Sequence, residues 1–104
     1  MSVRLASAVW VQAFLRRCDL AAVPVYVLRR GDADAGEIWL KLVKASDEVS
    51  ILRVSREDHT STVHKVLDEV EADRHLARQE TYDPDLWVIE VDDRAGRSDS
   101  LFHG

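Results

Sequence analysis

Five carboxylates gather near the end of the 104-residue chain, where acid–base or metal chemistry would be easiest to build. They lie in and around the apolar run 86–91 and are Asp83, Asp85, Glu90, Asp92 and Asp93. A hard cation such as Mg²⁺ needs several oxygen ligands that converge on one point. The side chains of Asp92 and Asp93 diverge on an extended chain, and Asp83 lies at the opposite end of the run. We therefore expect turn and capping roles here, and no metal site.

A second charged set bears on nuclease chemistry: Asp32 or Asp34, with Glu37 and Lys41. Restriction-endonuclease-like enzymes place an Asp at one strand end and an acidic-x-Lys triplet on the next strand, so that carboxylates hold Mg²⁺ and the lysine steadies the charged transition state. Glu37 and Lys41 are four residues apart instead of two, which separates them by about 13 Å along a strand. A small nuclease-like or nucleic-acid-processing enzyme remains an alternative function, although the required acidic-x-Lys triplet is absent from the sequence.

Two arginine pairs, Arg16-Arg17 and Arg29-Arg30, are candidates for anion binding. Guanidinium groups recognise phosphate or carboxylate bidentately, and two pairs that face the same way would form a cluster. Such a cluster predicts a phosphate or small-ligand binder. The alternative is that the pairs are solvated ends of a helix and a strand, with nearby aspartates as partners.

The remaining reactive residue types show no catalytic pattern. The four histidines have no repeated metal-ligand spacing and are His59, His64, His75 and His103. Cys18 lies on the apolar side of an expected helix, where a buried inert thiol is typical. The sequence contains no Ser-His-Asp arrangement, phosphate loop or dinucleotide fingerprint. We expect no catalytic residues, no metal and no cofactor, and we favour a non-enzymatic protein.

Trp39 and Lys41 share one face of an expected strand, and they are our candidates for an interface. An exposed aromatic ring beside a cationic side chain is a frequent interface anchor. We expect Trp39 to be half exposed and this face, or an open strand edge, to contact a second copy of the chain. The sequence therefore predicts a homodimer, with another protein as a further possible partner.

Hydrophobic periodicity gives the elements that would position these residues. Residues 7–22 predict a helix with Trp10 and Phe14 on its apolar stripe and Ser7 as N-cap. Residues 25–30 and 37–44 predict a hairpin around the turn 31–36, and 50–55 predict a third strand.

The second half of the chain is less regular. The segment 62–67 fits a fourth strand better than the start of a helix, although its apolar spacing permits both. Asp68 is expected to cap a helix that continues to about residue 81, with His75 on its polar side. The run 86–91 is apolar on both sides, which predicts a central strand. Residues 98–104 form a flexible tail unless Leu101 or its neighbour docks.

The predicted fold is therefore a single α+β domain over residues 1–104. Its elements follow the order α-β-β-β-(β)-α-β, with helices packed on a mainly antiparallel sheet of four or five strands. One cysteine fits a reducing compartment, and no signal peptide or apolar run of membrane-spanning length is present. We expect a cytoplasmic protein with no membrane partner.

The charge is distributed unevenly along the chain. Residues 1–56 hold nine Lys or Arg against six Asp or Glu, and residues 57–104 hold five against thirteen, so the net charge of −5 divides into +3 and −8. We interpret the halves as solvated faces. The alternative is that the basic half meets an acidic partner, which includes the acidic half of a second copy. The acidic total argues against a nucleic-acid partner.

Several segments together resemble one known family. They are Arg4-Leu5-Ala6-Ser7 with Trp10-Val11, Leu15-Arg16-Arg17-Cys18, Arg29-Arg30-Gly31 with Ala35-Gly36, and residues 83–94. The chain is similar to the small bacterial proteins of domain-of-unknown-function family 1491, found chiefly in alphaproteobacteria. The resemblance is weakest over residues 55–67. It implies a compact single-domain cytoplasmic protein, and it implies no activity and no catalytic residues.

Overall fold

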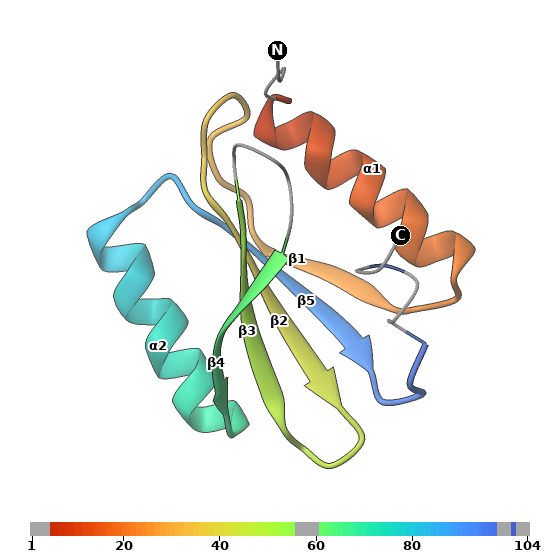
Figure 1. Cartoon of the computed structure of the whole chain (residues 1–104). Helices are drawn as coiled ribbons and strands as arrows, with labels where there is room; N and C mark the ends of the chain where they lie inside the picture. Colours follow the sequence, from red (N-terminus) through yellow and green to blue (C-terminus); the bar gives the residue numbers. More distant parts are fainter. Residues whose placement is uncertain (1–4, 56–60, 98–100, 102–104) are drawn as a thin grey trace.

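A computed structural model describes residues 5–55, 61–97 and 101 (Figure 1). These residues form an α+β domain with the element order α-β-β-β-β-α-β, as the sequence predicted. The elements are α1 Ser7–Leu20, β1 Val25–Arg29, β2 Ile38–Lys44, β3 Val49–Val54, β4 Ser61–Leu67, α2 Glu69–Tyr82 and β5 Trp87–Asp93. The ambiguous segment 62–67 is a strand. Neither described helix is long and apolar enough to cross a membrane.

The strands form one sheet with the order β1-β5-β2-β3-β4. β5 runs parallel to β2, and the other three pairs are antiparallel. The predicted hairpin between β1 and β2 is therefore wrong, because β5 lies between them. The physical reason lies in β5 itself. Val88 and Ile89 point to opposite faces and are both buried, so both faces of this strand must be covered. That requirement favours a position inside the sheet, between two other strands. Its predicted central position is confirmed.

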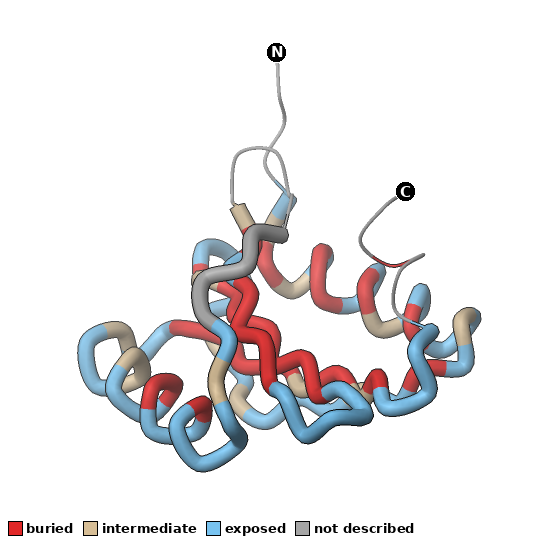
Figure 2. Tube along the Cα trace, turned by 60° about the horizontal axis from the view of Figure 1, so that its bottom comes forward, coloured by how far each residue is buried: buried red, intermediate tan, exposed pale blue. Residues whose placement is uncertain are grey.

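Each face of the sheet has its own core (Figure 2), and the buried residues are concentrated in the sheet and on the side of α1 that faces it. The α1-side core includes Trp10, Phe14, Leu40, Ile89 and Val91. The α2-side core includes Trp39, Val43, Ile51, Leu76 and Val88. Burial of each large apolar side chain contributes roughly 1.5–3 kcal/mol.

The two helices cover their faces unequally. α2 lies mainly along β3 and β4, while β1 and β5 are on the other side of the sheet's midline (Figure 1). On the α2 side, Val88 of β5 is buried in the core shared with α2, and Arg29 of β1 lies 3.9 Å from Glu80 of α2. Tyr26, farther out on β1, is 52% exposed.

The start of α1 differs from its prediction. Ala6 is the N-cap residue, and Ser7 is the first helical residue, is buried, and donates its Oγ hydrogen to the Gly36 carbonyl at 2.6 Å. The Ser7 backbone N–H donates to the Asp34 carbonyl at 3.2 Å. Carbonyl groups of the loop between β1 and β2 thus accept hydrogen bonds at the start of α1, where we expected the Ser7 hydroxyl to act as the acceptor.

The glycines of that loop serve close packing and not a hairpin turn. A Cβ atom on Gly31 would lie 2.3 Å from the Asp85 carbonyl oxygen, and one on Gly36 would lie at the same distance from it. Real Cβ atoms do not approach backbone oxygen so closely, so both positions require glycine. The loop packs against the chain entering β5.

Asp68 caps α2 as predicted, since its carboxylate accepts a hydrogen bond from the Glu71 backbone N–H at 2.8 Å. His75 was expected on the polar side of this helix, and that prediction is wrong. It is 4% exposed and packs edge-on against Trp39, with the ring centroids 5.8 Å apart. Of the predicted tail 98–104, only Leu101 lies within the described residues. It is buried, and its carbonyl accepts a hydrogen bond from Arg17.

Candidate interaction surface

Trp39 is buried, which corrects the expectation that it would be half exposed. Only 4% of the residue is exposed, because α2 covers its side of β2. The Arg53 guanidinium lies over the ring at 5.9 Å from its centroid. Sequence alternation placed Trp39 and Lys41 on the same face correctly, yet the ring is part of the monomer's core and is not available as a surface anchor.

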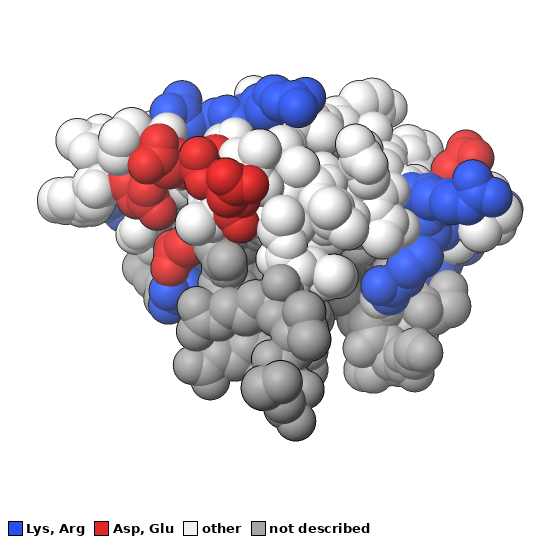
Figure 3. All heavy atoms as spheres, turned by 90° about the horizontal axis from the view of Figure 1, so that it is seen from above, with Lys and Arg blue, Asp and Glu red and all other residues white. Residues whose placement is uncertain are grey.

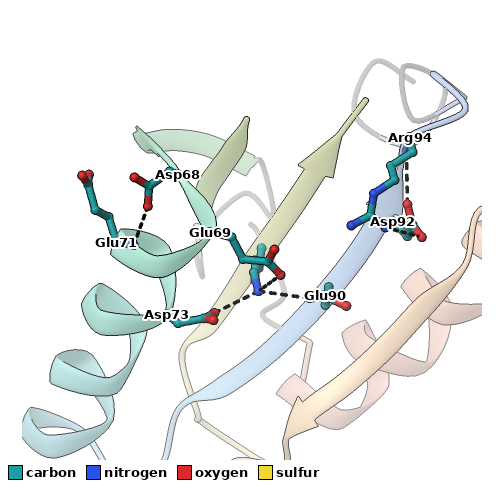
Figure 4. Close-up of polar contacts among 8 residues, drawn as sticks. Asp68, Glu69, Glu71, Asp73, Glu90, Asp92 and Arg94 are labelled. Atoms are coloured by element: carbon teal, nitrogen blue, oxygen red, sulfur yellow. Dashed lines mark hydrogen bonds and ion pairs between the residues drawn. The ribbon is translucent and has the colours of Figure 1, made fainter. Parts of the chain in front are cut away.

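Lys41 is the second predicted interface residue, and it lies at the centre of a charge cluster. Its Nζ is 2.9 Å from Asp73 Oδ1, 3.2 Å from Glu90 Oε1 and 3.3 Å from Glu69 Oε1. Figure 4 shows Glu69 and Asp73 reaching from α2, and Glu90 from β5, toward this common point. The Lys41 side chain is only 4% exposed. One buried cation therefore ties α2 to the middle of the sheet.

The electrostatics of this cluster decide what Lys41 can do. Burial by itself would lower the pKa of Lys41, but the hydrogen bonds and charges of Asp73, Glu90 and Glu69 outweigh it and raise the pKa. The amine therefore stays protonated at neutral pH and has no free electron pair. Nucleophilic or Schiff-base chemistry needs the opposite shift. The cluster is built to hold the fold together and not to react.

The structure does not bring the two arginine pairs together. Arg29 and Arg30 adjoin the loop that packs on the first turn of α1, whereas Arg16 and Arg17 lie more than two turns farther along that helix. Nine or ten residues of helix correspond to roughly 14 Å. Seen from above, Lys and Arg side chains form separate patches, with uncharged surface before the patch on the right and acidic surface between those on the left (Figure 3). A single four-arginine site is not formed.

Three of these four arginines, Arg17, Arg29 and Arg30, contact neighbouring groups. Arg17 donates to the Leu101 carbonyl. Arg29 donates to the Pro84 carbonyl at 2.5 Å and lies 3.9 Å from Glu80. The Arg30 guanidinium stacks over a tryptophan of β5 at 5.5 Å from the ring centroid.

The carboxylates around β5 accept hydrogen bonds from neighbouring backbone groups. Asp83 accepts from the Asp85 N–H at 3.1 Å, and Asp93 accepts from the Arg97 N–H at 2.6 Å. Within residues 5–55, 61–97 and 101, no group of three or more His, Cys, Asp or Glu is arranged to hold a metal ion. His59 and His103 lie outside these ranges. Glu37, the acidic residue of the nuclease hypothesis, is paired with Arg53.

Sequence reasoning did not single out the most exposed apolar strand. In β1, three consecutive residues are exposed: Tyr26 at 52%, Val27 at 42% and Leu28 at 53%. β1 is an edge strand, and an irregularity in its pairing with β5 lies between Val27 and Arg29. The run 25–30 was recognised as a strand, but only the sheet order shows that one side of it has no partner among the described strands.

The exposed edge and the buried lysine lie on one row across the sheet. Tyr26 pairs with Glu90, and Glu90 pairs with Lys41. This row runs from the exposed edge of β1 to the lysine that α2 covers. Of the two predicted interface candidates, Lys41 thus adjoins an open surface, although its own side chain is covered.

Comparison with known proteins agrees with this architecture. A family model described as "Protein of unknown function (DUF1491)" matches residues 5–100. A crystal structure of a DUF1491 family protein from Caulobacter crescentus is similar, with 30% identity, a TM-score of 0.80, and coverage of 91% of this chain and 92% of that one. No curated protein matches the chain.

Two solution structures are also similar. An NMR structure of a Caulobacter crescentus DUF1491 family protein has 31% identity and a TM-score of 0.73, and 91% of each chain is covered. Protein Atu0922 from A. tumefaciens has 22% identity and a TM-score of 0.76, with 86% of each chain covered. The last of these supports the fold alone.

Proposed function

The chain belongs to the DUF1491 family of proteins of unknown function, and since membership assigns no activity, we propose from the arrangement of its surface that it is a non-enzymatic, self-associating interaction module. The observation that carries this proposal is the open edge of β1, where Tyr26, Val27 and Leu28 are exposed side by side. Its single cysteine, Cys18, and the absence of a spanning helix among the described residues fit a cytoplasmic location.

An edge strand presents unpaired backbone N–H and C=O groups that can pair with another strand. Natural proteins commonly protect such an edge with charge, proline or a bulge. β1 has the irregularity at Leu28 and arginine at its end, but its centre is apolar. A second chain that pairs here would satisfy backbone groups and reduce the exposure of Tyr26 and Val27, which point to opposite faces of the sheet.

A second copy fits this edge because the edge of each chain carries both a positive and a negative side chain. Arg29 lies at the end of β1, on the sheet face that also carries Asp92. Asp92 adjoins the beginning of β1, where its N–H donates to the Pro24 carbonyl at 2.9 Å. Two antiparallel β1 strands related by a two-fold axis would place each Arg29 about 10 Å between backbones, two strand spacings, from the partner's Asp92. To pair across the contact, the two side chains would exchange their present contacts with Pro84 and Arg94. A long guanidinium side chain spans most of that distance.

The test is the solution mass of the protein by light scattering, at low and at high salt. We expect a dimer near twice the 11.8 kDa chain mass that weakens but persists when surface charge is screened. Val27→Glu should give monomers, because it places two like charges at the centre of the contact. Val66→Glu is the matched control, since Val66 is 52% exposed on β4, the other edge strand.

A monomeric parent protein at all accessible concentrations would refute self-association. A dimer that survives Val27→Glu but dissociates on Val66→Glu would place the contact on the other edge.

The two alternative functions have less support. The Asp32 carboxylate accepts from the backbone N–H groups of its own loop at 2.8 and 3.2 Å, and Glu37 pairs with Arg53, so the nuclease set is committed to local contacts. Mg²⁺-dependent cleavage that is lost in Glu37→Ala would restore that hypothesis. Thermal stabilisation by phosphate that is lost in Arg30→Ala would restore the anion-binding one.

A further inference from the structure

A small cavity lies between α2 and the end of β4, at the edge of the sheet opposite β1 (Figure 1). Its volume is about 210 Å³, and it is lined by Leu67, Glu71, Arg74 and Arg78. Leu67 is the last residue of β4 and packs against the α2-side core, so it supplies an apolar surface. The other three residues belong to α2 and are exposed. The cavity thus combines one apolar side chain with three charged ones.

The two sides of α2 make different electrostatic contacts. Glu69 and Asp73 lie on the side that reaches Lys41 in the middle of the sheet. Arg74 and Arg78 instead line the cavity on the β4 side. The positive charge of these arginines is therefore directed to a part of the surface that the Lys41 ion pairs do not occupy.

The two arginines of the cavity are not neutralised by the helix that carries them. Neither guanidinium has a hydrogen bond or an ion pair in the described parts of the chain. The positions three and four residues from Arg78 contain no carboxylate, and they hold Arg74, His75, Thr81 and Tyr82. Like charges four residues apart repel each other on a helix surface. An anion bound between Arg74 and Arg78 would relieve this repulsion and give both groups a partner.

We propose that this cavity binds a small phosphate monoester, with the phosphate group between the Arg74 and Arg78 guanidinium groups and the carbon skeleton against Leu67. Side chains four residues apart on a helix have Cβ atoms about 5–6 Å apart, so two forked guanidinium groups can approach one tetrahedral anion together. A phosphate monoester carries close to two negative charges at neutral pH, which matches the two arginines. The proposal goes beyond self-association, because the cavity lies on the β4 edge.

The Glu71 carboxylate restricts which phosphate compounds fit. It lies one helical turn before Arg74 and adds a negative charge at the end of the cavity nearest the start of α2. A hydroxyl group of the ligand can donate a hydrogen bond to this carboxylate, whereas a second acidic group would be repelled. A monoester with a free hydroxyl group, such as glycerol 3-phosphate, therefore fits the cavity better than inorganic phosphate.

The size and surroundings of the cavity disfavour larger anions. Pockets for drug-sized ligands usually measure about 300–1,000 Å³, and this cavity is smaller than that range. A nucleic acid would bring its phosphate backbone close to the other charged residues of α2, which include Glu69, Asp73 and Glu80, and these would repel it.

The experiment is an NMR titration of the isotope-labelled full chain with glycerol 3-phosphate, and with inorganic phosphate and glycerol for comparison. Saturable shift changes are expected at the backbone amides of Leu67, Glu71, Arg74 and Arg78. Glycerol 3-phosphate should bind about threefold more tightly than inorganic phosphate, because of its hydrogen bond to Glu71. Glycerol alone should produce no saturable change.

A double variant and a matched control separate this cavity from general attraction to basic side chains. Arg74→Gln with Arg78→Gln should weaken glycerol 3-phosphate binding about tenfold, since both charge-assisted contacts are lost. The control is Arg16→Gln with Arg97→Gln, which removes the same charge from two exposed residues elsewhere and should change affinity by less than about twofold.

A further variant tests the role of the carboxylate. Glu71→Ala removes the side chain that accepts the ligand's hydroxyl group and keeps a good helix former at that position. It should abolish the preference for glycerol 3-phosphate over inorganic phosphate. A preference that persists in Glu71→Ala would overturn the assignment of a hydroxyl-bearing ligand.

Equal weakening by the two double variants, shift changes spread over all basic surfaces, or no saturable change in the parent protein would overturn the proposal. If the Arg74/Arg78 variant fails to fold, the shift map of the parent protein and the single variant Arg78→Gln still decide. Val27→Glu should bind glycerol 3-phosphate with unchanged affinity, so that failure of ligand binding and failure of self-association are observed separately.

Discussion

Replacement of Lys41 by methionine would remove the positive charge at the centre of the cluster while keeping most of the side-chain volume. The aliphatic part of Lys41 is covered by α2 and the sheet, and methionine can occupy the same space. The three carboxylates would then lie close to one another with no cation between them. The variant therefore tests electrostatics with little change in packing.

The magnitude follows from the exposure of each partner. Glu69 and Asp73 are more than half exposed, and such pairs contribute only about 0.5 kcal/mol each. The Glu90 side chain is 24% exposed, so loss of its partner leaves a partly buried charge and costs about 1–2 kcal/mol. Relief of the lysine's own desolvation offsets part of this sum. We expect the free energy of unfolding to fall by about 2 kcal/mol, equivalent to roughly 10 °C in the melting temperature.

The assay is urea unfolding followed by tryptophan fluorescence, with Lys44→Met as the matched control. Lys44 is an exposed residue on the same strand, and its replacement should change stability by less than about 0.5 kcal/mol. Adding Glu90→Gln to Lys41→Met should recover about half of the loss, because the partly buried charge is then removed. A Lys41→Met protein as stable as the parent would refute the reasoning, since it would show that the carboxylates do not depend on the lysine.

Two further predictions concern other parts of the molecule. Burial raises the pKa of Cys18 from 9.0 to about 11, and the pKa of Lys41 is raised above 10.5; in both cases the unfolded chain loses its proton first. Stability should therefore be constant up to about pH 9, fall between pH 9 and 11 through Cys18, and fall further above pH 10.5 through Lys41. A flat profile of urea midpoints between pH 9 and 11 would contradict the Cys18 assignment. Gly31→Ala should destabilise the fold by about 2–4 kcal/mol, because the added methyl group meets the Asp85 carbonyl at 2.3 Å; a thermal melt within 2 °C of the parent would show that the loop can move away.

The sequence specifies local structure well where one stripe of residues decides it. Trp10, Phe14 and Cys18 recur at helical spacing and are buried together. The run around Ile89 is apolar on both sides and is the central strand. In each case the spacing of apolar residues over a short segment indicates which sides of the element are buried.

What the sequence does not predict depends on which distant elements meet. Trp39 and Tyr26 are both aromatic residues in strands, and only the position of α2 decides that the first is covered and the second is open. Lys41 indicated an exposed face because lysine is rarely buried. Its burial is possible because α2 and β5 bring three carboxylates to it. The sequence around Lys41 does not indicate such contacts between distant residues.

The position of β5 also affects how the chain can fold. Among the described strands this one comes last in the sequence, yet it pairs with both β1 and β2 in the interior of the sheet. During synthesis the first described strand lacks its partner β5 until nearly sixty later residues have emerged, so the apolar edge of β1 stays unprotected on both sides for that time. Formation of the native sheet must then wait for contacts between distant parts of the chain, which slows folding. An apolar strand that remains unpaired during that wait is also the first place where two nascent copies would meet.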